Sequence, residues 1–259
     1  MLSTIRNYKE LIYFLVHKEL RVKYRNSFFG FFWSLLEPLG MMVIYTIVFS
    51  IIIGGRFEVD NYPLFVLSGL IPWMFVANTL NKGAKSLTKN SSLIKKVYFP
   101  RQIFPISAML ANLVNFIPAL GLVIVLALVT QGGEMPYSHL LVLPGIIALH
   151  ALIVLSITIV LSVLNVYYKD VEIILSVVLR GWMYLSPIIY PLHIIPDQYI
   201  DWYLLNPMAV VISLYRWTFF ADTVIPLKYI VYVSVLAILG CLAAWALFNR
   251  LSRRVGEII

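Results

Sequence analysis

The sequence predicts an all-α, polytopic membrane protein with six transmembrane helices, an N-terminal amphipathic helix and short re-entrant helices between spans five and six. Two observations predict this class. The 259 residues are 61% hydrophobic and only 12% charged, whereas a soluble chain is about half apolar and about a quarter charged. In addition, charge-free apolar runs recur along the chain, and a spanning helix needs about 20 such residues. The runs are continuously apolar instead of alternating, which favours helices over barrel strands.

The same composition excludes other classes. The chain is rich in Leu, Ile, Val and aromatic residues, so it is not a disordered protein. Its single cysteine, Cys241, excludes an intrachain disulfide framework and a Cys-based zinc site. The sequence carries no G-x-x-x-x-G-K-[ST] loop, no H-E-x-x-H and no G-x-S-x-G. We therefore predict that this chain is not an enzyme and that it binds no metal or cofactor of its own.

Residues 5–25 are predicted to form a basic amphipathic helix. Apolar residues recur at helical spacing on one face, and the charged residues lie largely elsewhere on the wheel. A helix of this kind lies in the headgroup plane of a membrane. The pattern fits a plain membrane anchor, and it also fits an interface helix that touches a cytoplasmic partner. The residues that such an interface would use are Arg6, Lys9, Glu10 and Lys18.

The charge-free runs place five of the six spans. They are residues 38–55 with an aromatic approach from Phe28, then 61–81, 102–133, 135–168 and 229–249. The fifth span, from about 171 to 186, is apolar but has Arg180 inside it. The segment 187–228 carries five prolines, so no long uninterrupted helix fits there. Its apolar piece, 208–221, is short and is interrupted by Arg216. We predict a re-entrant or interfacial helix at that place.

The basic residues predict the orientation. With six spans, sixteen of the 20 Lys and Arg residues fall on one side: in the N-terminal segment, in the loop at 82–101, at Lys169 and in the C-terminal tail. Basic residues gather in cytoplasmic segments, so both termini are predicted to be cytoplasmic. A seventh span at 208–221 would leave the basic tail outside. The net charge of +8 is therefore mostly a topology signal and does not indicate nucleic-acid binding.

The loop at 82–101 mixes six basic residues with a short apolar patch at 93–99. A solvated basic loop does not need such a patch. Exposed apolar groups among charges are typical of a docking surface, although the patch would equally pack on the bilayer.

Few ionisable groups lie within the spans. Glu37 and Arg180 are the candidates for an ion-coupled transporter, and His150 fits a packed, hydrogen-bonded side chain. An integral-membrane enzyme would need a cluster of acids or histidines, and no spacing unites those present. The many aromatic residues toward the outer side fit an interfacial belt, or they line a path for sugars. The aromatic candidates for such a path are Trp33, Trp73, Trp182, Tyr184 and Tyr190.

Six sequence motifs in order carry a resemblance to a known family. They are KYRNSFFGFFWSLLEPLGMMVIYTIVFS at 23–50, LSGLIPWMFVANTL at 67–80, KKVYFPRQIFP at 95–105, LNVYYKDVEIIL at 164–175, SPIIYP at 186–191 and LNPMAVVISLYR at 205–216. Together they resemble the permease subunit of ABC-2-type polysaccharide exporters, which export O-antigen, capsule and teichoic acid in bacteria. The resemblance covers nearly the whole chain, so residues 1–259 are expected to form one transmembrane domain.

The resemblance implies partners as well as a substrate. It implies a homodimer of this chain with two copies of a separate ATPase subunit, and ATP and Mg²⁺ would bind to that subunit. The substrate would be a polysaccharide on an undecaprenyl-type lipid carrier, moved from the cytoplasmic to the outer side of the bacterial inner membrane. Related ABC-2 permeases export drugs or other small molecules, which remains an alternative.

The resemblance also implies roles for particular segments. The helix at 5–25 would be the interface helix, and 187–228 would form short outer helices. The pathway would lie at the dimer interface, near spans one, two and five. Arg21, Lys23 and Arg25 are candidates for attracting the pyrophosphate of the lipid carrier, although the positive-inside rule alone explains them equally well. The loop at 82–101 would hold a coupling helix that docks into the ATPase through Leu93, Ile94, Lys95, Lys96 and Val97.

Overall fold

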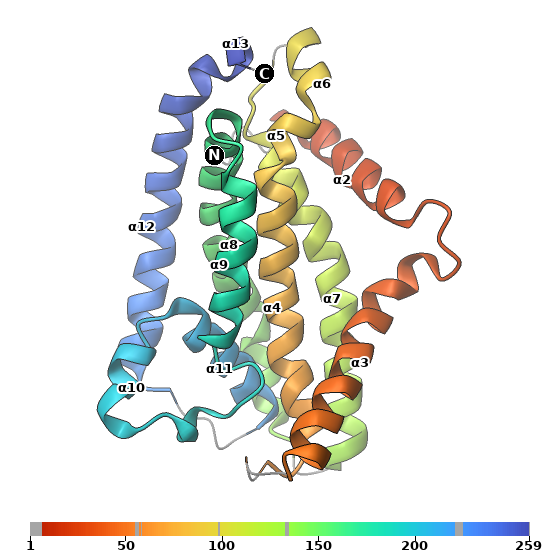
Figure 1. Ribbon diagram of the computed structural model, residues 1–259, viewed down its shortest axis with the longest axis vertical. Helices are drawn as coiled ribbons and strands as arrows, with labels where there is room; N and C mark the ends of the chain where they lie inside the picture. Colours follow the sequence, from red (N-terminus) through yellow and green to blue (C-terminus); the bar gives the residue numbers. More distant parts are fainter. Residues whose placement is uncertain are drawn as a thin grey trace.

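The computed structural model describes residues 7–54, 57, 59–97, 99–132, 135–220 and 225–258, and over these residues all regular secondary structure is helical. Figure 1 shows the long helices running along a common direction as a bundle. The short helices α2 (Lys9–Tyr24), α5 (Ser86–Lys89), α6 (Ser91–Lys96) and α13 (Val255–Ile258) lie toward one end. We call this the basic end, because α2, α5 and α6 carry many lysines and arginines. The opposite end holds α10 (Asp197–Tyr203) and α11 (Pro207–Phe219).

Five of the predicted spans are helices long and apolar enough to cross a membrane. The first, Gly30–Ile52, joins η1 (Gly30–Phe32), α3 (Trp33–Thr46) and the π-helical η2 (Ile47–Ile52). The others are α4 (Tyr62–Ala84), α7 (Ile103–Gln131), η4 (Tyr137–Val142) continued by α8 (Leu143–Tyr167), and α12 (Leu227–Leu251). The aromatic approach to the first span is therefore helical from Gly30 onward. Prolines inside α3, α4 and α7 are tolerated because neighbouring groups satisfy the freed carbonyls of membrane helices.

The predicted fifth span corresponds to α9 (Val171–Tyr184), which has 14 residues. At 1.5 Å per residue this helix is about 21 Å long, shorter than the roughly 30 Å hydrocarbon layer. It is not among the five candidate spans, so the count of six stays a prediction. Figure 1 shows α9 running beside the long helices, between the two ends of the bundle.

Helix α4 forms the centre of the core. Of its most apolar 18 residues, 78% are buried, against 6% for the first span. It packs against α3, α7, α8, α9 and α11. At its start, the Asn61 side chain accepts a hydrogen bond from the Leu64 amide at 3.3 Å, which caps the helix. The first span thus exposes apolar surface while α4 lies inside.

Small residues allow close helix contacts with α4. A Cβ on Gly83 would lie 2.1 Å from the Thr158 methyl group of α8. A Cβ on Gly69 would lie 3.1 Å from Nη2 of Arg216 in α11 and 3.2 Å from the Ile188 carbonyl oxygen. Small residues at such crossings are typical of membrane helix packing.

Two predicted segments differ in detail between the sequence prediction and the structure. The amphipathic helix at 5–25 is α2, which runs from Lys9 to Tyr24; Arg6 lies outside the described residues. The loop at 82–101 is largely helical: α4 continues to Ala84, and α5 and α6 follow. The 187–228 segment contains η5 (Leu192–Ile194), α10 and α11, as expected of short helices. The last span is followed by η6 (Ser252–Arg254) and α13.

Candidate functional site

A corner of the chain joins α4 to the short helices of the basic end. Leu87 of α5 is fully buried, and Ser86 and Asn90 are buried beside it. The Asn90 amide donates to the Ser86 carbonyl at 2.8 Å, and Lys18 Nζ of α2 donates to Asn90 Oδ1 at 3.1 Å. Helix α5 is therefore held between the core and α2.

Helix α6 presents a mixed surface. Leu93 and Ile94 are half-buried and pack against the hydrophobic core, whereas Lys95, Lys96 and Val97 are exposed. The predicted docking patch is thus divided: its first two apolar residues anchor α6, and the next three face outward. The exposed part combines two positive charges with one apolar side chain.

Helix α2 rests on this corner. Its buried residues Ile12 and Leu15 face inward, and the helix packs against α7. Lys89 of α5 forms an ion pair with Glu19 of α2 at 3.0 Å. The other predicted interface residues, Lys9 and Glu10, are exposed, so they are free of the core packing that holds the inner face.

The same corner is tied to the start of α9. Lys85 Nζ lies 2.9 Å from Glu172 Oε2, and the Asn165 amide donates to Glu172 Oε1 at 2.9 Å. These contacts join the corner between α4 and α5, and the end of α8, to the start of α9.

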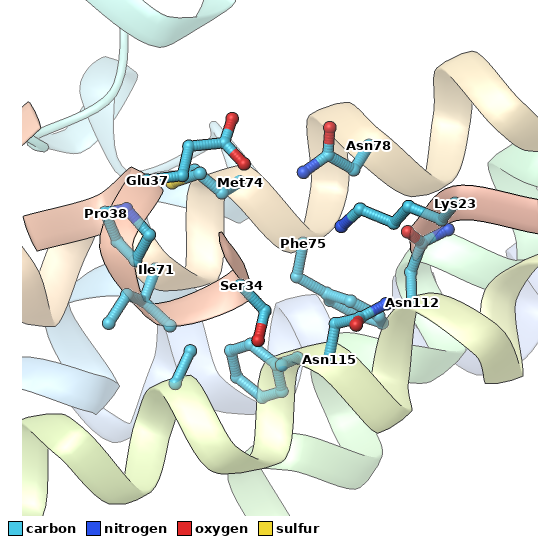
Figure 2. Close-up of a pocket in the computed structure, with 12 residues that line it drawn as sticks. Lys23, Ser34, Glu37, Pro38, Ile71, Met74, Phe75, Asn78, Asn112 and Asn115 are labelled. Carbon is cyan, nitrogen blue, oxygen red and sulfur yellow. The ribbon is translucent and has the colours of Figure 1, made fainter. Parts of the chain in front are cut away.

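Polar side chains meet in a small pocket between α2, α3, α4 and α7. The cavity has a volume of about 40 Å³. Figure 2 shows the Lys23 side chain entering it near Asn78 and Asn112, with Glu37 at another wall. The Tyr24 hydroxyl donates to Asn115 Oδ1 at 2.6 Å, so the end of α2 is hydrogen-bonded to α7.

The predicted pyrophosphate residues divide at this pocket. Lys23 lines it and Arg21 and Arg25 do not, although all three residues are exposed. The asparagines that line the pocket, Asn78, Asn112 and Asn115, were not predicted as site residues. The available signal was a polar amide side chain inside an apolar run. Among the described residues, Glu37 and Arg180 form no ion pair with each other, and both are exposed.

Most of the predicted pathway aromatics gather at the opposite end. Trp73 of α4 packs edge-on against Trp182 of α9, with ring centroids 5.7 Å apart. The Tyr190 hydroxyl donates to the Tyr184 carbonyl at 2.7 Å. Trp33 packs instead on Phe29, at 5.6 Å. The structure brings four of the candidates together in two pairs, Trp73 with Trp182 and Tyr184 with Tyr190, and Trp33 belongs to neither pair.

Arg216 is a buried charge that holds this end together. Its Nη2 donates to the Ile188 carbonyl at 2.7 Å, and its Cζ lies 3.5 Å from the centre of the Phe65 ring. Carbonyl dipoles and an aromatic face thus stabilise the guanidinium. The residue fixes the 186–191 turn against α4 and α11. In the sequence it stood out only as an interruption of an apolar run.

An exposed pair links α10 to α12. The Tyr229 hydroxyl donates to the Asp201 carboxylate, and Lys228 Nζ lies 3.3 Å from it. Both contacts hold the pKa of Asp201 below its usual range, with the tyrosine bond the larger cause. Helix α10 is therefore fastened to the start of α12.

The first span and α9 expose continuous apolar surface. Both helices pack on α4 through one side. Their outward residues are Val43, Ile44, Ile47, Ile51 and Ile52 in the first span, and Ile173, Ile174, Val177 and Val178 in α9. Such a surface contacts lipid or another protein.

Comparison with known proteins decides the family. Residues 10–220 match the family described as ABC-2 type transporter. The chain belongs to this family. It is 29% identical to the O-antigen export system permease protein RfbA of Myxococcus xanthus, over 100% of this chain and 99% of that protein. It is 30% identical to the protein of the same name from Klebsiella pneumoniae, over 96% and 95%.

A more distant relative belongs to a second export system. The polysialic acid transport protein KpsM of Escherichia coli is 26% identical over 77% of each chain. The relatives are named as permeases and transport proteins. This ABC-2 chain is accordingly a multi-pass membrane transport subunit and not an enzyme.

Proposed function

We propose that this chain is the transmembrane subunit of an ATP-driven exporter that moves a lipid-linked polysaccharide from the cytoplasmic to the outer side of the bacterial inner membrane. The observation that carries the proposal is the similarity to O-antigen export permeases over 100% of this chain and 99% of the relative. The polysialic acid transport relative supports the same class of substrate.

The chain needs a partner that hydrolyses ATP, because it carries no nucleotide-binding loop. The partner is a separate ATPase subunit, present in two copies, which binds ATP and Mg²⁺. It docks at the basic end, on the exposed face of α6 formed by Lys95, Lys96 and Val97 and on the exposed face of α2 that carries Lys9 and Glu10. The ion pair between Lys85 and Glu172 supports a route by which docking motion reaches α9.

The chain works as a homodimer with both termini in the cytoplasm. The exposed apolar faces of the first span and α9 support this pairing, since both helices flank α4. In the bilayer, α9 together with residues 185–188 forms the fifth of the six crossings. Helices α10 and α11 lie at the outer side. The pathway runs between the first span, α4 and α9 of the two copies, past Trp73, Trp182, Tyr184 and Tyr190.

Lys23 is the inner-side residue best placed to attract the pyrophosphate of the lipid carrier. It combines a positive charge with the neighbouring amides of Asn78 and Asn112, whereas Arg21 and Arg25 do not line the pocket. Charged hydrogen bonds of lysine to phosphate are among the strong ones.

The docking face of α6 can be tested with one substitution and a matched control. Val97 is 52% exposed at the basic end, and Ile194 is 42% exposed in η5, outside the candidate spans. Val97→Asp is expected to weaken co-purification of the ATPase by about ten-fold or more, since it places a charge in an apolar contact. Ile194→Asp is expected to leave co-purification unchanged. Equal co-purification of both variants would place the docking face elsewhere.

The function itself is tested by depleting the chain in its native cell. Lipid-linked polysaccharide is expected to accumulate in the cytoplasmic leaflet while the surface glycan is lost, and re-expression is expected to reverse both. A normal surface glycan together with retention of a drug or another small molecule would favour the alternative ABC-2 exporter.

A further inference from the structure

A second cavity lies at the basic end, between α2, the α4–α5 corner and α7. Its volume is about 240 Å³, far above the roughly 10–15 Å³ that a single water needs. It is separate from the pocket of Figure 2, which opens toward α3. None of the roles proposed above uses this cavity.

Its polar lining is rich in lysine. Lys82, Lys85 and Lys89 face the cavity, and Glu19 is the single carboxylate among its lining residues. Lys89 is paired with Glu19, and Lys85 is paired with Glu172. The other polar lining residues are Asn81, Ser86, Asn90 and Ser107.

Lys82 has no carboxylate partner among the residues that the structure describes. Its recorded bond is to the neutral Asn112 Oδ1, at 3.2 Å. With Lys18, which bonds Asn90, the lysines around the cavity number four against the two glutamates. The site therefore keeps a net positive charge that an anion would balance.

Ser86 is a second observation that indicates an anion in this cavity. It is buried, and within the described residues its hydroxyl has no hydrogen-bond partner. A buried hydroxyl without a partner is costly. An anion in the cavity would accept a hydrogen bond from Ser86 and neutralise Lys82 together.

The remaining walls are apolar. Leu15, Phe104 and Ala108 line the cavity and are buried against the core. A free phosphate ion gains nothing from such walls, whereas a lipid brings a phosphate and apolar chains together. Basic pockets between the cytoplasmic ends of membrane helices suit acidic lipid headgroups.

We propose that this cavity binds a phosphate group carried by a lipid of the cytoplasmic leaflet. The bound phosphate bridges Lys82 and Ser86 and completes the attachment of α2 to the α4–α5 corner. The inference rests on the orientation proposed above, which places the basic end in the cytoplasm. Two lipids carry the required group: an anionic phospholipid and the diphosphate of a polyprenyl carrier.

The test measures lipid retained by the full chain in native mass spectrometry. The chain is taken from nanodiscs of phosphatidylcholine with phosphatidylglycerol, and separately from nanodiscs with polyprenyl diphosphate; inorganic phosphate is the free-ion probe. Lys82→Gln is expected to reduce retention of the anionic lipid by about ten-fold or more, because it removes a charged hydrogen bond. Lys169→Gln removes an exposed lysine at the same end, outside the cavity, and is expected to change nothing.

Ser86→Ala is the second cavity variant, and it keeps the test valid if Lys82→Gln fails to fold. It removes one hydroxyl and is expected to reduce retention several-fold. If retention of phosphatidylglycerol or of polyprenyl diphosphate falls in both Lys82→Gln and Ser86→Ala, the result supports the site. The lipid whose retention falls is then the one that supplies the phosphate. Retention equal in wild type, Lys82→Gln and Ser86→Ala overturns the proposal, and so does tight binding of inorganic phosphate without either lipid. Because retention is measured without transport, failure here leaves the exporter assignment intact.

Discussion

At the residue scale, Gly69 and Arg216 hold the outer turn in place together. The guanidinium of Arg216 reaches the Ile188 carbonyl only because Gly69 has no side chain: a Cβ there would lie 3.1 Å from Nη2 and 3.2 Å from that carbonyl oxygen. Both neighbours are fixed, one by its hydrogen bond and the other by the backbone. The turn leads from α9 to α10, so its position sets where the outer helices lie.

Gly69→Ala is therefore expected to destabilise the protein by about 1–3 kcal/mol, as overpacking of a tight core does. Gly145→Ala in α8 is the matched control, because a Cβ at that position meets nothing within 4 Å. The control is expected to be neutral or slightly stabilising, since alanine favours helix. Thermal unfolding in detergent compares the two variants; equal midpoints would show that the turn yields to the added methyl.

Single polar residues were only partly predictable from the sequence. Lys23 was found among the basic residues near the inner rim, but it was not separable from Arg21 and Arg25. The separation depends on where α2 ends relative to α7, where Tyr24 bonds Asn115 at 2.6 Å. Hydropathy carries no information on that contact. Arg216 was visible as a charge in an apolar run, yet its carbonyl and aromatic partners come from other segments.

At the element scale, apolar runs in the sequence predict where the spans lie, but they do not predict which spans are buried. Five spans were predictable because a helix of about 20 apolar residues is the simplest way to satisfy a backbone in lipid. The segment 82–101 was predicted as a loop, with a coupling helix in it only through the family resemblance, since Ser, Asn and Lys weaken the helical pattern there. The structure forms two short helices in this segment, α5 and α6. They form because Leu87 and Leu93 pack on the core, which is a tertiary effect.

The crossing of α4 and α8 gives a second prediction. A Cβ on Gly83 would lie 2.1 Å from Cγ2 of Thr158 but 3.6 Å from its Oγ1. Gly83→Ala is expected to push α4 and α8 apart and to destabilise the protein by about 1–3 kcal/mol. Removing the clashing methyl by Thr158→Ser is expected to restore most of the loss.

The double variant makes this outcome specific. The free energy of unfolding of Gly83→Ala, Thr158→Ser and the pair forms a double-mutant cycle. A favourable coupling of about 1 kcal/mol or more is expected, since the two positions are in contact. Additive effects in the cycle would mean that the loss from Gly83→Ala arises elsewhere than at Thr158.

At the scale of the whole molecule, the chain is a membrane transport subunit of the ABC-2 family. Its core is centred on α4, while the first span and α9 expose apolar side chains. Sequence patterns predicted the family through six motifs, and the match over residues 10–220 confirms it. They did not predict that α4 is the central helix, because every span is apolar. Its small residues Ser68, Gly69 and Gly83 were the available signal.

The basic end holds both the proposed docking helices and the ion pair that joins them to α9. Helices α2, α5 and α6 lie together, and Lys85 joins their corner to α9. The proposed docking residues there, Lys95, Lys96 and Val97, are exposed, while Leu93 and Ile94 pack against the core. The account therefore requires that hydrolysis by the partner and movement of the glycan occur together, with this chain between them.

The most direct measurement is made on vesicles that contain this chain and its ATPase, with a lipid-linked polysaccharide in the outer leaflet and ATP supplied outside. The account predicts that ATP removes the glycan from the pool accessible to a glycosidase, and that a non-hydrolysable nucleotide does not. A glycan that stays fully accessible while the intact complex hydrolyses ATP would contradict it. Movement driven by an ion gradient without the ATPase would contradict it equally.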